Sequence, residues 1–587
     1  MTPIKAEAIS IHRLLRALCA LAMTILLSGF LGKRDTAESI LSRIPVQSGG
    51  RVKPFESFAH EALLSVTGKT SLEKKNAAAV VWGWITRPET WNTQSFLPVR
   101  NAALRQEFAL MVIGGKISPE LVLTHAPFQE KVEEALAKEE KKEPLLFLEK
   151  KRIELYDQAR LFQAIVQGSL PGFFPNPQDP RAGWIPLSGL ADPEKRIQLE
   201  QSYSPAGLAA VQASLARLVE ALREDKTVIA RKRSDRSNDE IAAKEFSASL
   251  HQLFESRDIL LDQTKIKLEL FYNQIHPFKW AWIFYLTSAL IWFLLRERAP
   301  QLFLACFISG FLYHTAGFFL RCYLVGRPPV TNMYESIIWV AWAAVLFSSI
   351  LGLIYKKTVL SASAAWVAFF TLLIGESFPA VLDPSLAPLV PVLRNNYWLT
   401  VHVLTITLSY GAFALACGIA HACLFQFAFQ PNKKKAPPPK GGGEEQEQLA
   451  QYLYRALQIG VVLLATGTIL GGVWANDSWG RFWGWDPKET WALIALFGYL
   501  AVLHGRFAGW LGNFGTAFGA VVAFLGVLMA WYGVNFVLAA GFHSYGFGGG
   551  GLPYVASAVA LDLVLISFLA FRYNHRKLNP ALSQKRK

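Results

Sequence analysis

The chain of 587 residues is 52% hydrophobic and only 18% charged, and its mean hydropathy is +0.26. These values exclude an ordinary soluble protein of this length and indicate a membrane protein. The formal charge of +15 would suit a nucleic-acid partner. However, the basic residues follow the topology described below and form no basic–aromatic recognition surface, so we expect no nucleic-acid binding. The five cysteines form no C-x-x-C pair, which excludes a thioredoxin-like site and a haem-attachment motif within the chain.

Apolar runs of about 20 residues, long enough to cross roughly 30 Å of hydrocarbon, predict the membrane-spanning helices. The ten predicted spans lie near residues 14–32, 280–296, 302–320, 336–355, 359–375, 398–428, 456–474, 490–505, 513–538 and 555–572. The first run could instead be a signal peptide, because it is short and follows Arg13 and Arg16. The predicted fold class is therefore an all-α polytopic membrane protein with about ten transmembrane helices.

The basic residues set the orientation of these helices. With the N-terminus inside, pairs such as Lys356 and Lys357 and the basic C-terminal tail fall on the inner side, whereas the short outer loops hold few basic residues. Both termini are thus predicted inside. The predicted domains are an N-terminal membrane anchor or signal-like segment (1–32), an extracytoplasmic domain (33–279) and a multi-span domain (280–587). Apolar residues at three- and four-residue spacing predict that the extracytoplasmic domain is mainly helical.

Residues 474–491, WANDSWGRFWGWDPKETW, form a segment that we call the tryptophan loop. It concentrates five of the chain's 18 tryptophans between two predicted spans, and these are Trp474, Trp479, Trp483, Trp485 and Trp491. Such a loop can present indole faces to a large flat apolar ligand. An aromatic belt at the membrane interface would also enrich tryptophan, so both interpretations stay open.

The polar residues of the tryptophan loop also have structural interpretations. Asp486, Pro487 and Glu489 match a helix start with an N-cap carboxylate, a proline at the first position and a glutamate at the third. We therefore expect Asp486 and Glu489 to cap a helix rather than to act as an acid or base. Arg481 and Lys488 either meet carboxylates of a ligand or flank the membrane interface.

Histidines within the predicted spans are candidate functional residues. His402 near the outer end of the sixth span and His543 after the ninth lie on the same side as the tryptophan loop. Two such imidazoles can ligate haem iron from both faces, although each could be a hydrogen-bonded interfacial histidine. His504 lies roughly 24 Å deeper than the loop, so it would need a second, inner site. His421 is interpreted mainly as a packed helix histidine, and alternatively as the partner of His504.

The run WGRFWGWDPKETW at 479–491 resembles the WWD signature of haem-handling proteins, in the form found in the CcsA (ResC) family. This family provides the membrane subunit of the System II cytochrome c synthase. Four further motifs are similar to the family: RPPVTNMYES at 327–336, NYWLTVH at 396–402, LHGR at 503–506 and GFHSYG at 541–546. The resemblance covers about residues 280–572.

The resemblance implies a role in cytochrome c biogenesis, as a haem–apocytochrome c ligase. In this role the protein carries haem b to the extracytoplasmic face and presents it for thioether attachment to the CXXCH motif of apocytochrome c. The resemblance implies that His402 and His543 ligate the haem iron at an outer site and that His504 ligates haem in transit. The residues implied to hold the haem face are Trp474, Trp479, Trp483, Trp485 and Trp491, with Arg481 and Asp486.

The resemblance also implies a ResB (CcsB) membrane partner. We see no ResB-like region, so the histidine opposite His504 is expected from a separate subunit. The implied location is a bacterial inner membrane, with the tryptophan loop and residues 33–279 on the periplasmic side. Two alternatives stay open: a haem exporter and a b-type electron-transfer cytochrome, neither of which would attach haem covalently to an acceptor.

Overall fold

The structure is a computed structural model that describes residues 36–73, 75–179, 182–223, 233–259, 261–295, 298–379, 381–388, 396–429, 445–538 and 551–578. The described residues form two compact units. One unit contains residues 36–275 and 385–388, and the other contains 276–384 and 396–578.

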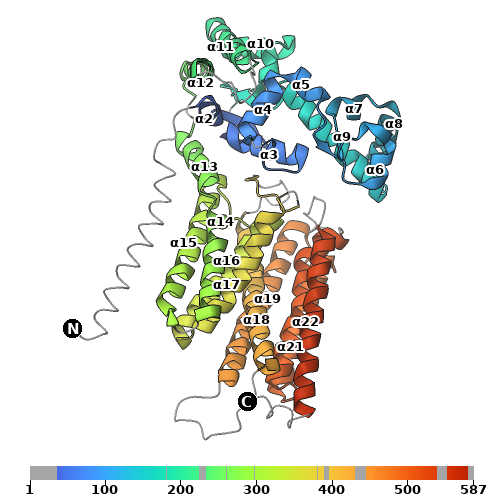
Figure 1. The fold of residues 1–587 in the computed structure, drawn as a ribbon, viewed down its shortest axis with the longest axis vertical. Coiled ribbons are helices and arrows are strands. Elements are labelled where there is room, and N and C mark those ends of the chain that lie inside the picture. Colours follow the sequence, from blue (N-terminus) through green and yellow to red (C-terminus); the bar gives the residue numbers. More distant parts are fainter. Residues whose placement is uncertain are drawn as a thin grey trace, which may run out of the picture. The chain divides into compact units, whose positions relative to one another are not determined.

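The second unit is a bundle of long apolar helices that run side by side (Figure 1). In the described part of the chain, nine helices are long and apolar enough to cross a membrane. The helices are α14 (Pro277–Leu295, continuous in the chain with α13, Gln263–Ile275), α15 (Pro300–Val325), α16 (Met333–Tyr355), α17 (Thr358–Ser377), α18 (Asn396–Phe429), α19 (Glu445–Trp479), α20 (Pro487–Phe507), α21 (Asn513–Leu528, continued by the π-helix η5, Met529–Leu538) and α22 (Leu552–Leu578). The prediction of an all-α multi-pass protein is confirmed. The first predicted span, 14–32, lies outside the described residues.

Glycine residues allow α18 and α19 to approach closely. A Cβ atom at Gly467 would lie 2.9 Å from the Cα of Ile406, and one at Gly460 would lie 2.4 Å from the ring of Phe413. Without a hydrophobic drive between helices in lipid, such small residues favour association by close van der Waals contact. This packing brings His402, one turn before Ile406, against the backbone of α19.

The first unit is mainly helical, as predicted, and also contains short strands that the sequence did not reveal. Its helices are α2 (Ala37–Ser42), α3 (Phe55–Thr67), α4 (Ala77–Thr86), α5 (Pro88–Thr93), α6 (Ala102–Glu107), η1 (Ala109–Met111), α7 (Pro119–Thr124), α8 (Ala126–Glu140), α9 (Phe147–Val166), η2 (Leu187–Leu190), α10 (Pro193–Ser202), α11 (Pro205–Arg223), α12 (Arg233–Glu255) and α13. Strands β1 (Pro45–Ser48), β2 (Arg51–Pro54), β5 (Gly172–Phe174) and β6 (Ile185–Pro186) form an antiparallel sheet in the order β2-β1-β5-β6. A second antiparallel pair is β3 (Leu97–Pro98) with β4 (Lys116–Ile117).

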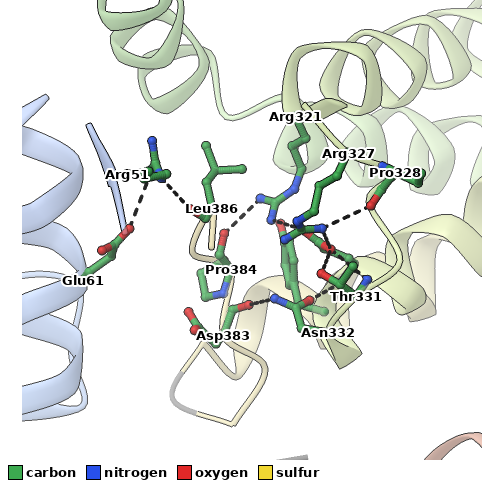
Figure 2. A network of polar contacts seen from close by, with 12 residues as sticks. Arg51, Glu61, Arg321, Arg327, Pro328, Thr331, Asn332, Asp383, Pro384 and Leu386 are labelled. Atoms are coloured by element: carbon green, nitrogen blue, oxygen red, sulfur yellow. Dashed lines mark hydrogen bonds and ion pairs between the residues drawn. The ribbon is translucent and has the colours of Figure 1, made fainter. Parts of the chain in front are cut away.

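Aromatic packing and one arginine hold distant segments of this unit together. Trp84 is fully buried against Phe96 and Phe162, with ring centroids 5.9 and 5.2 Å away. Arg51 donates two hydrogen bonds of 2.7 Å to the carboxylate of Glu269. It donates a third to the carbonyl oxygen of Leu386 (Figure 2). Such bidentate arginine–carboxylate geometry fixes both partners in orientation as well as distance.

Candidate functional site

The tryptophan loop is shorter than predicted. Helix α19 extends through Trp479 and α20 begins at Pro487, so only residues 480–486 of the predicted loop 474–491 are irregular. Gly480 follows the helix with a φ of +70°, the left-handed conformation that commonly ends a helix. Trp474 and Trp479 are consequently placed by a rigid helix rather than by a loop.

The capping prediction for Asp486 and Glu489 is confirmed. The Asp486 carboxylate accepts a hydrogen bond of 3.0 Å from the backbone N–H of Lys488. In return, Glu489 Oε2 accepts from the backbone N–H groups of Asp486 (3.3 Å) and Gly484 (2.8 Å). These bonds satisfy N–H groups that a helix start leaves without intrahelical partners, and they fix where α20 begins.

A pocket of about 200 Å³ lies among α16, α18, α19, α20 and η5, and we call it the His402 pocket. Five of its lining residues were singled out in the sequence: His402, Trp474, Trp483, Lys488 and Glu489. Asn332 and Met333 belong to the RPPVTNMYES motif, whereas others were missed, among them Tyr410, Trp531, Asn535 and Phe536. Three of the missed residues come from η5, and π-helical segments are frequent at functional sites.

The geometry at His402 shows which ring nitrogen carries the proton. Nδ1 lies 2.8 Å from the carbonyl oxygen of Gly467, and because a carbonyl only accepts, Nδ1 must carry the proton. In the neutral ring the lone pair is then on Nε2. Metal-binding histidines almost always donate their other N–H in this way. The ring also stacks on Trp474, with centroids 6.1 Å apart and planes 15° apart.

The predicted tryptophans have different surroundings in the structure. Trp474 and Trp483 line the pocket, while Trp479 packs edge-on against Trp474 at 4.9 Å. Trp485 is 70% exposed, and Trp491 lies in the first turns of α20, outside the pocket lining. Arg481 lies 5.9 Å over the Trp479 ring, and neither Arg481 nor Asp486 is among the described lining residues. Direct contact with haem therefore stays a prediction for the residues outside the lining, which are Trp479, Trp485, Trp491, Arg481 and Asp486.

The three other candidate histidines are His504, His543 and His421. His504 is exposed in the last turn of α20, where Nδ1 donates to the Leu500 carbonyl oxygen at 2.8 Å. It does not line the His402 pocket, and its role in transit stays a prediction. His543 lies outside the described residues.

His421, interpreted from the sequence mainly as a packed helix histidine, forms an ion pair of 2.8 Å with Asp562 that the sequence did not reveal. Among the described residues, no group of three or more His, Cys, Asp or Glu side chains is arranged to hold a metal ion.

Lys488 places a cation at the His402 pocket. Its Nζ atom donates to the side-chain oxygen of Asn535 at 3.3 Å. Within the part of the chain that the structure describes, no carboxylate forms an ion pair with it. Lys488 is half-buried, and charges withdrawn from water are normally paired, so this ammonium group is suited to meet an anionic group of a ligand.

A buried charge cluster supports one wall of the pocket. Glu335, at the start of α16, accepts hydrogen bonds from Arg321 (2.9 Å) and Arg327 (2.7 Å). It also accepts from the backbone N–H (3.0 Å) and hydroxyl (2.9 Å) of Thr331. Figure 2 shows Arg321 and Arg327 directed toward Pro384 and Thr331, and Arg321 donates to the Pro384 carbonyl oxygen at 2.9 Å. Because Thr331 lines the pocket, the cluster positions that wall.

A Gly471→Ala substitution tests how closely His402 is held. An added Cβ atom would lie 2.5 Å from Cε1 and 2.9 Å from Nδ1 of His402, so the imidazole must shift. We expect about a tenfold loss or more of affinity for a ligand bound through His402, as when an orienting partner of a metal ligand is removed. Gly498→Ala on α20 is the matched control, because its nearest neighbour is 3.8 Å away. Ligand affinity would be measured by spectrophotometric titration, and equal affinities for the two variants would contradict the expectation.

The fold and the pocket define a multi-pass helical membrane protein with a histidine-bearing aromatic pocket. Residues 330–542 match a family described as cytochrome C assembly protein. The chain is 28% identical over 555 residues to protein NrfI of Wolinella succinogenes, a match that covers 88% of this chain and 56% of NrfI. It is 34% identical over 273 residues to the cytochrome c biogenesis protein CcsA of Synechococcus sp. strain CC9605, covering 43% of this chain and 88% of that protein. It is 35% identical over 258 residues to CcsA of Prochlorococcus marinus strain MIT 9303, covering 40% of this chain and 80% of that protein.

The chain therefore belongs to the CcsA family of cytochrome c biogenesis proteins. The chain spans little more than half the length of NrfI.

Proposed function

We propose that the protein presents haem b at the His402 pocket for covalent attachment to the CXXCH motif of an apocytochrome c. The observation that carries the proposal is the geometry of His402. Its Nδ1–H is held by the Gly467 carbonyl oxygen, which places the lone pair of the neutral ring on Nε2, and its ring is stacked on Trp474. Imidazole nitrogen is a common axial ligand of haem iron, and indole faces suit a large flat macrocycle.

Each remaining group of the pocket has a role in holding haem. Trp483 contacts the macrocycle, and Lys488 pairs with a propionate carboxylate. His543, after η5 in the chain, supplies the second axial ligand, and the histidine of the CXXCH segment displaces one of the two. The protein thus protects the iron and orients the vinyl groups.

The bond-forming step needs positioning rather than a protein acid or base. Each cysteine thiol adds across one haem vinyl group, so that sulfur bonds to one carbon and hydrogen to the other, and no group leaves. The reaction requires ferrous haem and reduced thiols. Holding both reactants at contact distance can supply several kcal/mol of the barrier, about 7–11 in well-oriented cases.

The remaining parts of the proposal concern haem supply and assembly. His504 ligates haem in transit together with a histidine of a ResB (CcsB) partner subunit. The protein lies in the bacterial inner membrane, with the pocket and residues 36–275 on the periplasmic side. The concentration of basic residues in the predicted inner segments supports this orientation.

A Lys488→Met substitution tests the propionate contact. The wild-type protein should bind haem about 10–100-fold more tightly than haem dimethyl ester, because a charge-assisted hydrogen bond contributes about 1.5–3 kcal/mol. Lys488→Met should lose this preference while its affinity for the diester stays unchanged, and Lys488→Arg should keep part of it. If Lys488→Met still binds haem more tightly than haem dimethyl ester by the same factor, a cation other than Lys488 contacts the propionates.

The proposed function is tested by purifying the protein from membranes with and without its ResB partner. The absorption spectrum reports bound haem, and a co-expressed apocytochrome is assayed for covalently attached haem. A bis-histidine spectrum together with covalent product supports the synthase. Bound haem without covalent product in the presence of the partner would favour an exporter or an electron-transfer cytochrome.

A further inference from the structure

The membrane unit contains a second and much larger cavity, of about 2080 Å³, which we call the large cavity. Its walls come from α14, α16, α17, α18, α19, α21, η5 and α22. It is lined along α17 from Thr358 to Phe378, which corresponds to roughly 30 Å of helix. The large cavity is therefore long enough to extend across most of a bilayer.

The lining of the large cavity combines three kinds of chemistry. Most of it is aliphatic or aromatic, including Trp366 and Phe370. One end, where α17 begins and α18 finishes, carries the cations Arg298 and Lys357. Between the two ends a histidine and an aspartate, His421 and Asp562, face the same space. An apolar wall, cations at one end and an imidazole match a flat amphipathic ligand that bears carboxylates and a metal.

The His421–Asp562 pair is an ionisable pair within predicted membrane-spanning helices. Nδ1 of His421 lies 2.9 Å from the carbonyl oxygen of Cys417 and must donate to it. Nε2 lies 2.8 Å from Oδ1 of Asp562, so one proton is shared between these two atoms. Ionisable residues in membrane helices are costly and usually functional. His421 resembles His402 in two respects, since each ring is fixed by a hydrogen bond from Nδ1 to a backbone carbonyl oxygen and each residue lines a cavity.

The large cavity adjoins the His402 pocket. Met333, Val381 and Trp531 line both spaces, so the wall between them is a single layer of side chains. Trp531 lies in the π-helix η5, and its indole N–H donates to the hydroxyl of Ser336 at 2.8 Å. If these side chains move, a ligand in the large cavity can reach the His402 pocket.

We propose that the large cavity is a further haem-binding site, in addition to the sites proposed at His402 and at His504, in which His421 ligates the iron. When haem binds, the bond between iron and Nε2 forms, the Nε2–Oδ1 hydrogen bond breaks and the shared proton stays on the Asp562 carboxyl group. His421 lies eight residues before the end of α18, about 12 Å along the axis, so Lys357 and Arg298 are placed to meet the propionates. This proposal rests on the proposed function, because it assigns haem as the ligand.

The test is a haem titration of the purified full-length wild-type protein and of His421→Gly, Asp562→Ala and His402→Gly variants, followed by absorption spectroscopy. His421→Gly should lose about one equivalent of haem, which added imidazole restores. Asp562→Ala should keep that equivalent or bind it more tightly, because Nε2 no longer has a competing partner. His402→Gly should keep the His421-dependent equivalent. Thr405→Val is the matched control and should bind as the wild type does, because Thr405 lies on α18 like His421, donates only to the carbonyl oxygen of Val401 and lines neither cavity.

Two results would overturn the proposal of a haem site in the large cavity. Equal haem loss in His421→Gly and Asp562→Ala would show that the pair only ties α18 to α22. Unchanged haem binding in His421→Gly would show that another ligand, such as bilayer lipid, occupies the large cavity. Failure of the proposed function is distinguishable from both, because then the wild-type protein itself would bind no haem or His402→Gly would bind as much as the wild type.

Discussion

A His402→Gly variant is expected to bind haem at the His402 pocket at least about 100-fold more weakly than the wild type. Loss of a partner that merely orients a metal ligand typically costs 10–100-fold in affinity, and this substitution removes the ligand itself. The Nδ1–H bond to the Gly467 carbonyl oxygen and the stacking on Trp474 disappear with the ring. The measurement is a haem titration followed by absorption spectroscopy, with covalent haem on a co-expressed apocytochrome c as the second readout.

Two comparisons separate loss of the ligand from general damage to α18. Val401→Gly adds the same backbone freedom at the neighbouring position but leaves the imidazole in place, so it should bind haem nearly as the wild type does. Imidazole added to His402→Gly should enter the vacated space and restore part of the haem spectrum. Full haem occupancy of His402→Gly without added imidazole would contradict the assignment of His402 as an axial ligand.

The local features of the site could be predicted from the sequence. The cap at Asp486 follows from a short run of residues, because helix starts are fixed by side chains within one turn. The membrane spans follow from apolar length. His402 was recognised because a histidine in an apolar span is unusual, and the structure places it beside Trp474.

The parts of the site that depend on tertiary contacts could not be predicted. Trp531 and Asn535 line the His402 pocket because η5 is π-helical, which no periodicity in the sequence indicated. Asp562 pairs with His421 across 141 positions of the chain. The extension of α19 through Trp479 was missed because Asn476 and Asp477 interrupt the apolar run, although contacts such as Trp474–Trp479 accompany the continued helix.

Glu335→Gln is expected to lower the free energy of unfolding of the membrane unit by about 3–5 kcal/mol, the usual cost of removing one partner from a buried ion pair. Glu335, Arg321 and Arg327 are each less than 10% exposed, so water cannot compensate the two guanidinium charges. The substitution can also replace the Glu335 oxygen that accepts hydrogen bonds from the backbone N–H and the hydroxyl of Thr331. Unfolding in mixed detergent–SDS micelles measures the change. Gln458→Ala, which lies in the same unit and removes the exposed hydrogen bond from Arg455 to Gln458, should cost at most about 1 kcal/mol.

The Glu335 cluster should also affect ligand binding, because the turn that it holds forms part of the His402 pocket. Thr331 and Asn332 line the pocket, and Asn332 caps α16 through a 2.8 Å bond from the backbone N–H of Glu335. Glu335→Gln should therefore weaken haem binding even under conditions where the bundle stays folded, whereas Gln458→Ala, outside the pocket lining, should not. A destabilised Glu335→Gln variant with unchanged haem affinity would limit the cluster to a structural role. A variant as stable as the wild type would show that the two arginines do not depend on Glu335 for charge compensation.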